Sequence, residues 1–107
     1  MSLATKLQLK PGQVIAVMNA PAGFELDAPA AEDALLLFVR DSSELGEPLF
    51  EAARGDRLAW LAYPKGGQLG TDLNRDVLWE LTKAHAVRPV RQVSIDGVWS
   101  ALRFRPA

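Results

Sequence analysis

Three continuous apolar runs dominate the pattern of hydrophobic and polar positions along the chain. They span residues 13–18, 34–39 and 58–63. Within each run the apolar residues follow one another instead of alternating with polar ones, which is typical of strands covered on both faces, as in a parallel sheet. The pattern therefore predicts three buried strands. The third is the central one, and it leads into a Gly-rich loop that begins at Lys65.

Two helices are predicted after the second and third strands. Ser42 or Ser43 can cap the first helix. Because a glycine and a proline interrupt its periodicity, one continuous helix and two short pieces meeting near Glu47 both fit. The second helix spans residues 72–86, with Thr82 on its polar side. Its expected apolar stripe consists of Leu73, Val77, Leu81 and Ala84.

The last third of the chain predicts a hairpin. Residues 89–95 alternate between apolar and polar side chains, and Asp96-Gly97 is a favoured two-residue turn because both positions tolerate positive φ. Residues 98–104 form the returning strand. Strands joined through helices become parallel neighbours with right-handed crossovers. The predicted fold is a small three-layer, Rossmann-like α/β domain over residues 1–107, whose mainly parallel sheet ends in an antiparallel β-hairpin.

Residues 19–33 do not fit this regular pattern. Pro21, Gly23 and Pro29 punctuate the segment, and we interpret it mostly as loop.

Composition excludes several classes of function. The net charge is −1, so no overall field recruits nucleic acid or an anionic membrane, although acidic residues concentrate in the first half of the chain and basic residues in the second. There is no cysteine, which excludes disulfides, Cys-ligated zinc, iron–sulfur clusters and thiol nucleophiles. No apolar run approaches the roughly 20 residues of a membrane span, and the N-terminus lacks a signal-peptide pattern. We expect a cytoplasmic protein that binds neither membrane nor nucleic acid.

Candidate ligand-binding residues follow from the expected sheet, because ligands bind outside the carboxyl ends of strands in open α/β folds. Lys65 and Arg40 would be anion anchors there, with Asn19 and Trp99 shaping the pocket and Asp72 nearby. The alternative interpretation is that any sheet edge collects polar residues. In that case Asp72, like the aspartates at 41 and 96, is a helix cap or turn residue.

The loop at residues 65–71 is only faintly similar to a phosphate-binding loop, because its lysine precedes the glycines and the Gly-Lys-Ser/Thr order is missing. Backbone amides at the start of the next helix can bind an anion beside Lys65. Asp72 would compete for the same positive helix end. A flexible connector is the alternative interpretation.

His85 is the only histidine, and it lies at the far end of its helix. A base there would not reach a substrate at the carboxyl edge of the sheet. With no second histidine and no cysteine we expect neither a transition-metal site nor a cofactor.

The three tryptophans differ in their expected roles. Trp60 falls in a buried strand and is expected in the core. Trp79 falls in the middle of the polar side of its helix, and Trp99 begins the returning strand. Exposed tryptophans often anchor interfaces, so Trp79 is our candidate for contact with a protein partner or a second copy.

Three stretches carry a resemblance to a known family. They are Tyr63-Pro64-Lys65, the Asp-Leu-Asn-Arg-Asp piece at residues 72–76 and the Trp-Ser-Ala-Leu-Arg-Phe piece at residues 99–104. With flanking residues over nearly the whole chain, they resemble a bacterial family catalogued as a domain of unknown function. This resemblance implies kinship and no particular activity.

A fainter resemblance is to S-adenosylmethionine-dependent methyltransferases. Their first strand often reads Leu-Lys-Pro-Gly-x-Val, as residues 9–14 do here, and their sheet ends in a similar antiparallel hairpin. Ala16 stands where that family has an acidic residue, and Met18 and Ala20 stand where two glycines let the backbone approach the cofactor. The resemblance supports the fold and argues against the activity.

Two hypotheses follow. The first is a non-enzymatic module that binds a protein partner or itself, through the face of Trp79 or the outer hairpin strand. The second is a small-ligand site for an anionic metabolite or nucleotide at the carboxyl edge, which includes the possibility of a degenerate methyltransferase-like enzyme. The absence of a nucleophile–base set in the sequence favours the first.

Overall fold

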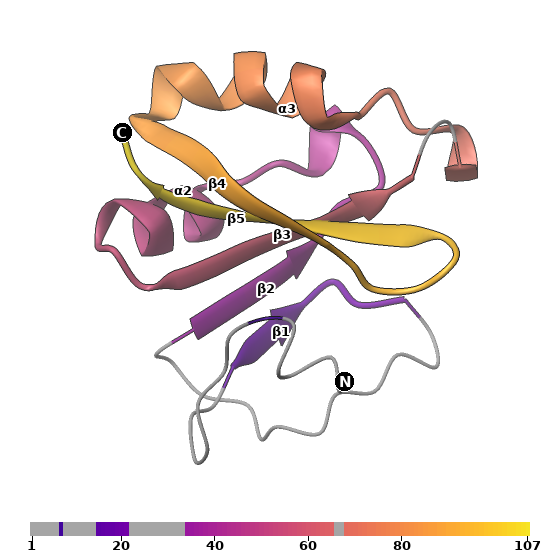
Figure 1. Cartoon of the computed structure of the whole chain (residues 1–107), viewed down its shortest axis with the longest axis horizontal. Helices are drawn as coiled ribbons and strands as arrows, with labels where there is room; N and C mark the ends of the chain where they lie inside the picture. The colour runs from indigo at the N-terminus through magenta and orange to yellow at the C-terminus, as the bar shows by residue number, and fades with distance from the viewer. Residues whose placement is uncertain (1–6, 8–14, 22–33, 66–67) are drawn as a thin grey trace.

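The computed structural model describes residues 7, 15–21, 34–65 and 68–107 (Figure 1). This part of the chain is mixed α/β, with five strands in one sheet and two α-helices, α2 at Glu47–Arg54 and α3 at Arg75–Thr82. Three short 3₁₀ turns accompany them, at Ser42–Glu44, Gln68–Gly70 and Lys83–His85. The strands are β1 at Ala16–Met18, β2 at Ala34–Phe38, β3 at Leu58–Pro64, β4 at Val87–Ser94 and β5 at Trp99–Pro106.

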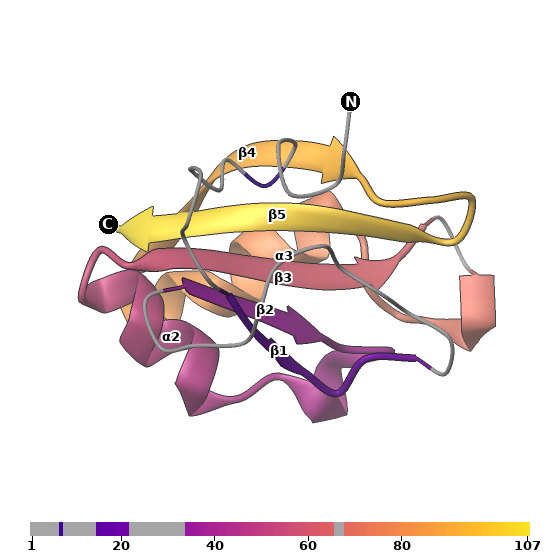
Figure 2. The ribbon, with the colours of Figure 1, turned by 90° about the horizontal axis from the view of Figure 1, so that it is seen from below.

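The strand order in the sheet is β1-β2-β3-β5-β4, which Figure 2 shows from its edge strand β1 to its other edge strand β4. β1, β2 and β3 are parallel to one another. Every residue of β2 and β3 is buried, as the continuous apolar runs predict. The first run forms the strand β1, but the predicted burial is wrong there, because Ala16 and Val17 are only partly buried and Met18 is 41% exposed. Residues 13 and 14 lie outside the described part.

β5 lies between β3 and β4 and is antiparallel to both. Asp96 orders the turn between β4 and β5, because its Oδ1 atom accepts hydrogen bonds from the backbone N–H groups of Val98 (2.8 Å) and Trp99 (2.9 Å). The pairing of β4 with β5 shifts register between Pro89 and Arg91, which is the signature of a β-bulge.

The segment between β2 and β3 consists of two helical pieces, so of the two alternatives that the sequence left open, two short pieces meeting near Glu47 are confirmed and one continuous helix is not. Asp41 caps the 3₁₀ turn at Ser42–Glu44 by accepting a hydrogen bond of 2.9 Å from the Ser43 N–H. Gly46 then precedes α2, which has a proline in its first turn. The caps predicted at Ser42 and Ser43 are therefore shifted to Asp41.

α3 is shorter than predicted and presents another face to the core. Asn74 caps it by accepting a hydrogen bond of 2.8 Å from the Val77 N–H. Leu78 and Thr82 are buried, whereas Leu81 is 40% exposed, so the predicted apolar stripe is wrong at its C-terminal end. Thr82 tolerates burial because its hydroxyl donates to the Leu78 carbonyl at 2.7 Å.

Two hydrophobic cores lie on the two faces of the sheet. One core contains residues of α2 and α3, among them Leu49, Phe50 and Leu78. The other contains Trp60, Phe38 and Trp99, together with Leu7 and Ile15 from the N-terminal part. In this second core the Trp60 Nε1–H donates to the Leu7 carbonyl at 2.9 Å.

The irregular segment at residues 19–33, past Pro21, lies outside the described residues. Among the helices that the structure describes, none is long and apolar enough to cross a membrane.

Candidate functional site

The polar residues at the carboxyl edge of the sheet separate into two groups. We call the first the Glu44 cluster, which ties the ends of β1 and β2 to the segment before α3 and consists of Asn19, Arg40, Ser42, Glu44 and Asp72. We call the second the Lys65 cavity, which lies between β3, β4, β5 and the start of α3 and is lined by Tyr63, Lys65, Asn74, Arg75, Gln92 and Ser100.

Glu44 is the hub of the first group. Its Oε2 atom accepts a hydrogen bond from Asn19 Nδ2 at 3.0 Å, and its Oε1 atom accepts one from the Arg40 backbone N–H at 2.6 Å. Asn19 also donates to the Phe38 carbonyl at 2.9 Å, and its backbone has φ 59°, a conformation that asparagine tolerates better than most residues. The Asn19 side chain therefore locks the end of β1 onto the end of β2.

Asp72 belongs to the same group. Its carboxylate accepts hydrogen bonds from the Ser42 N–H at 2.9 Å and the Ser42 hydroxyl at 2.5 Å. The bond from the hydroxyl has the largest effect and the bond from the N–H the next largest, and together they hold the pKa of Asp72 below its usual value. The expected competition of Asp72 for the helix end is wrong, because α3 begins three residues later and Asp72 binds Ser42.

The second group surrounds a cavity of about 220 Å³. Tyr63 and Lys65 come from the end of β3, Gln92 from β4 and Arg75 from the first position of α3. Gln92 and Ser100 reach the cavity because they lie on the helix-covered face of their strands, where Gln92 is paired with Leu102 and Ser100 with Tyr63.

The hydrogen bonds within the cavity wall fix its donors. Lys65 Nζ donates to the Ser94 hydroxyl at 2.7 Å and to the Asp96 carbonyl, which leaves one of its three protons for the cavity. Gln92 Nε2 donates to the Tyr63 hydroxyl at 3.0 Å. Burial raises the pKa of Tyr63. The charge of Arg75 and the hydrogen bond from Gln92 lower this pKa by smaller amounts, so the pKa remains above its usual value. Tyr63 is therefore a neutral hydroxyl whose own proton is available to an acceptor in the cavity.

Of the residues predicted at this edge, only Lys65 lines the cavity. Arg40 is exposed and contributes its backbone N–H to the Glu44 cluster. Trp99 is only 6% exposed and packs edge-to-face on Phe38, with ring centroids 5.1 Å apart. Trp99 therefore does not shape the Lys65 cavity, since β5 lies inside the sheet and Trp99 belongs to the core on the face away from α2 and α3.

Sequence reasoning missed the other cavity residues. Tyr63 was assigned only to a buried strand, and Asn74, Arg75, Gln92 and Ser100 were not singled out. A signal was present, because Tyr63, Asn74, Arg75 and Ser100 all fall within the specific stretches of the family resemblance.

Two further side chains lie away from the cavity. Trp79 is 44% exposed on α3, consistent with its predicted place on the polar side. The ring of His85 stacks on Phe50, with centroids 3.9 Å apart, and its carbonyl accepts a hydrogen bond from Arg54. His85 therefore packs against α2 on the helix-covered face.

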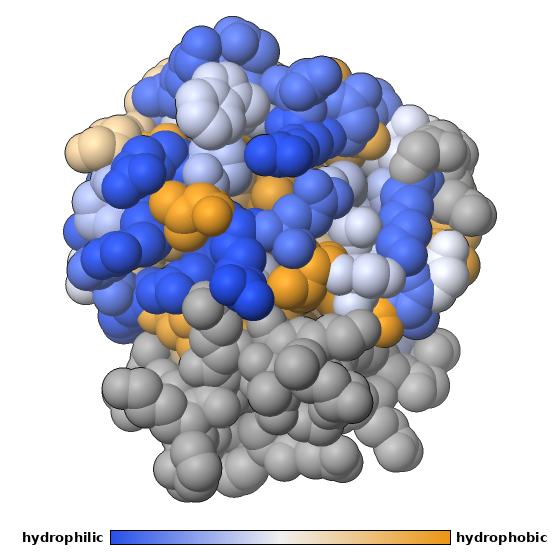
Figure 3. Space-filling view, in the orientation of Figure 1, coloured by the Kyte–Doolittle hydropathy of each residue, from blue (hydrophilic) through white to orange (hydrophobic). Residues whose placement is uncertain are grey.

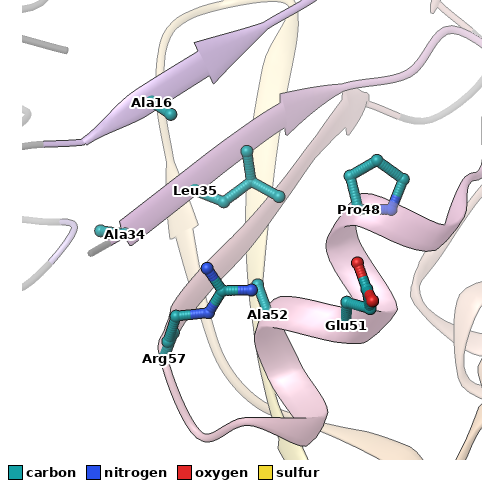
Figure 4. Close-up of a pocket in the computed structure, with 7 residues that line it drawn as sticks. All are labelled: Ala16, Ala34, Leu35, Pro48, Glu51, Ala52 and Arg57. Carbon is teal, nitrogen blue, oxygen red and sulfur yellow. The ribbon is translucent and has the colours of Figure 1, made fainter. Parts of the chain in front are cut away.

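A second cavity, of about 270 Å³, opens at the opposite edge of the sheet (Figure 4). Figure 4 shows Arg57 pointing between the starts of β1 and β2 and the helix α2, with Glu51 on the helix side. The remaining lining residues are Ala16, Ala34, Leu35, Pro48 and Ala52. This wall offers one cation, one carboxylate and otherwise the apolar side chains of alanine, leucine and proline residues.

Within the described ranges, no three His, Cys, Asp or Glu side chains gather closely enough to hold a metal ion. No family model matches the chain, and neither a curated protein nor a solved structure matches it. The chemistry open to the Lys65 cavity is therefore that of its own residues.

Proposed function

We propose that this protein is a non-enzymatic binding module and that the Lys65 cavity holds a small anionic ligand. The observation that carries the proposal is the convergence of two cations, Lys65 and Arg75, on one cavity whose remaining polar groups can all donate hydrogen bonds. Charge-assisted hydrogen bonds from such groups are the usual means of binding a carboxylate or a phosphate.

The balance of charge in the wall supports an anion. The six lining residues include no carboxylate. Arg75 forms no ion pair with the described residues, so its guanidinium is available to a ligand. The side-chain oxygen of Asn74 caps α3 by accepting the hydrogen bond from Val77, so its NH₂ group remains available as a donor. An anion would neutralise the two cations and accept from the surrounding donors.

The volume limits the size of the ligand. A water molecule occupies about 30 Å³ in the liquid, so a cavity of about 220 Å³ holds roughly seven waters. Pockets for drug-sized ligands begin at about 300 Å³. A phosphate or a short carboxylic acid fits this space, whereas a nucleotide or S-adenosylmethionine would extend beyond its open mouth.

The same residues support binding over catalysis. General acid–base catalysis at neutral pH uses a group that titrates near that pH. The raised pKa of Tyr63 keeps this phenol protonated, and the only histidine of the chain stacks on Phe50 away from the cavity wall. The wall thus offers donors and positive charge to a bound anion, without a base.

The fold that we propose is a Rossmann-like three-layer domain that ends in a β-hairpin, kin to the bacterial family of the resemblance. One support is the second core, in which Leu36, Phe38 and Trp60 are at most 1% exposed on the face away from α2 and α3, so that a further layer is needed to cover it. The other support is the antiparallel pairing of β4 with β5. In methyltransferases the loop after the first strand approaches the cofactor. Here Asn19, in the corresponding loop, donates a hydrogen bond to Glu44 instead, so the proposed kinship in fold does not extend to that activity.

Titration with inorganic phosphate and with acetate at constant ionic strength tests the cavity. We expect backbone amide NMR signals of the cavity residues to shift on addition of at least one of these anions. Lys65→Met should weaken that binding about tenfold, the effect of one charge-assisted contact. Arg75→Gln should weaken it to a similar extent.

Arg40→Gln is the matched control, because it removes an exposed cation from the same edge outside the cavity. An equal loss of affinity in Arg40→Gln would mean that the anion is attracted by the overall positive charge of this edge and does not bind in the cavity. Signals that stay fixed in both titrations, or that move only outside the cavity, would overturn the proposal.

A second candidate function is favoured by the 44% exposure of Trp79, a large aromatic side chain on the outer side of α3. Such a residue can anchor a protein partner or a second copy of the chain. Sedimentation of the wild type and of Trp79→Ala over a wide concentration range tests the version with a second copy. A wild type that remains monomeric throughout would exclude self-association through Trp79.

A further inference from the structure

Four arginines gather on one face of β4 and β5. Arg103 and Arg105 are two residues apart on β5, so their side chains point to the same face. Arg88 is paired with Arg105 across the ladder, and Arg91 is paired with Arg103. Directly paired residues share a face, so all four side chains lie together. Strongly hydrophilic side chains accordingly gather over β4 and β5 in Figure 3.

The charge of this arginine face is only partly balanced. Asp56 forms a bidentate pair with Arg105, with both N···O distances at 3.0 Å. Burial, together with the charges of Arg105 and Arg91, lowers the pKa of Arg103, so the like charges act on one another. Arg88 and Arg91 are exposed and take part in no ion pair with the described residues. An additional carboxylate would relieve this repulsion.

The arginine face borders a strand edge. β4 is the last strand of the sheet, and its outer backbone groups are available for pairing. Pro89 and the bulge next to it interrupt the first half of β4, whereas residues 91–94 are regular. A second copy of the chain pairing through β4 would bring Arg91 against further arginines, which like-charge repulsion disfavours.

We propose that β4 is the docking edge for an extended acidic segment of another protein, which adds to the sheet beside residues 91–94 while its carboxylates bind the arginine face. The Asp56–Arg105 pair shows how a carboxylate seats in this group, with two parallel N–H···O bonds from one guanidinium. Alternating acidic residues of an added strand would all point to the same face. An open strand edge matches a peptide backbone, whereas a nucleic acid would use the arginines alone.

A labelled peptide of alternating Glu and Val, about eight residues long, is the direct probe. We expect it to bind the wild-type protein, to shift the amide signals of residues 91–94, and to bind less tightly as salt is raised. Arg88→Gln combined with Arg91→Gln should weaken binding roughly fivefold or more. Arg40→Gln is the control, because Arg40 follows β2, which β3 and β5 separate from β4, and this variant should bind as the wild type does.

Three comparison ligands make each part of the proposal falsifiable with the wild-type protein, even if the arginine variants fold poorly. A peptide with Gln in place of Glu should bind weakly, and a peptide with alternate backbone N-methyl groups should lose the ability to pair with β4. Equal binding of either peptide would overturn the role of charge or of strand addition, respectively.

The third ligand is a short DNA duplex. Binding of the duplex but not of the acidic peptide would overturn the proposal in favour of nucleic acid. An edge that is merely guarded against pairing would bind none of these ligands, which would also overturn it.

Discussion

The Glu44 cluster and the Lys65 cavity lie at the same edge of the sheet, yet they use polar residues in opposite ways. In the Glu44 cluster two carboxylates receive four hydrogen bonds from Asn19, Arg40 and Ser42. In the Lys65 cavity the donors outnumber the acceptors, and about 220 Å³ of space remains between them. In the Glu44 cluster the donors and acceptors pair with one another and join loops, whereas in the Lys65 cavity hydrogen-bond donors remain available to a ligand.

This difference shows that a binding site is not indicated by polar residues at the carboxyl edge alone. Asn19 directly follows β1 and Asp72 lies in the loop between β3 and α3, as ligand-binding residues would, but their partners lie within the chain. The distinguishing properties of the Lys65 cavity are an excess of one charge and unfilled volume. Changes in the Glu44 cluster should therefore alter stability, and changes in the Lys65 cavity should alter binding.

Glu44→Ala is expected to give the largest change in stability. It removes two exposed hydrogen bonds, one from the Asn19 amide and one from the Arg40 N–H, at a cost of about 1 kcal/mol in the free energy of unfolding. Urea denaturation measures this cost. Glu51→Ala is the control, since the Glu51 carboxylate forms no ion pair with the described residues, and it should change the free energy by less than about 0.5 kcal/mol. A phosphate affinity that falls in Glu44→Ala would contradict the separation of the two groups.

Lys65→Met should reverse this pattern. Its own bonds join exposed partners in the β4–β5 turn, so the loss of stability should stay below about 1 kcal/mol. Phosphate at ten times its dissociation constant stabilises a binding protein by about 1.4 kcal/mol through mass action. Thermal unfolding with and without phosphate should show this gain in the wild type and in Glu44→Ala, and little of it in Lys65→Met. A gain that persists in Lys65→Met would place the anion elsewhere.

Ser42→Ala tests the lowered pKa of Asp72. With the hydroxyl gone, the pKa of Asp72 should rise toward its usual 3.8, which carboxyl NMR titration measures. A carboxyl with a folded-state pKa below its unfolded value stabilises the protein above the unfolded pKa, and this stability is lost as the pH falls through the folded pKa. The stability difference between wild type and variant should therefore be full above about pH 5 and narrow in acid.

Asp56 provides the internal control for that titration. Arg105 lowers its pKa independently of Ser42, so its titration should be the same in the wild type and in Ser42→Ala. A shift of Asp56 as large as that of Asp72 would indicate a general change in structure and not the loss of one hydrogen bond.

The sequence predicts the strands better than it predicts the site. Continuous apolar runs identify β2 and β3 because both of their faces are covered by cores. The burial of Trp99 was not predicted, because it depends on the insertion of β5 between β3 and β4, which no local pattern specifies. The buried face of α3 was misassigned because Thr82 satisfies its own hydroxyl within the helix and so can replace an apolar residue.

The composition of the cavity depends in the same way on distant contacts. Lys65 could be predicted because a cation after a buried strand is a local feature. Gln92 becomes a cavity residue only because β4 lies next to β5 and its side chain reaches Tyr63. Asp72 was expected near Lys65 at the carboxyl edge of the sheet, but its carboxylate binds Ser42, which lies 30 positions away in the sequence. Such pairings follow from the tertiary fold, which polar spacing does not reveal.

Tyr63 offers the smallest and most local test of the two regions. It is the only tyrosine in the chain, so phenolate absorbance reports the cavity alone. Its pKa is raised above 10.0 by burial. An acid with a raised folded-state pKa contributes stability that is present below the unfolded pKa and is lost as the pH rises through the folded value. An anion bound beside the hydroxyl disfavours the phenolate, so phosphate should raise the pKa of Tyr63 further.

Gln92→Ala should also raise the pKa of Tyr63, because it removes a hydrogen bond that lowers this pKa. Glu44→Ala should leave it unchanged, and a tyrosine titration that ignores phosphate but responds to Glu44→Ala would invert the roles assigned to the two regions.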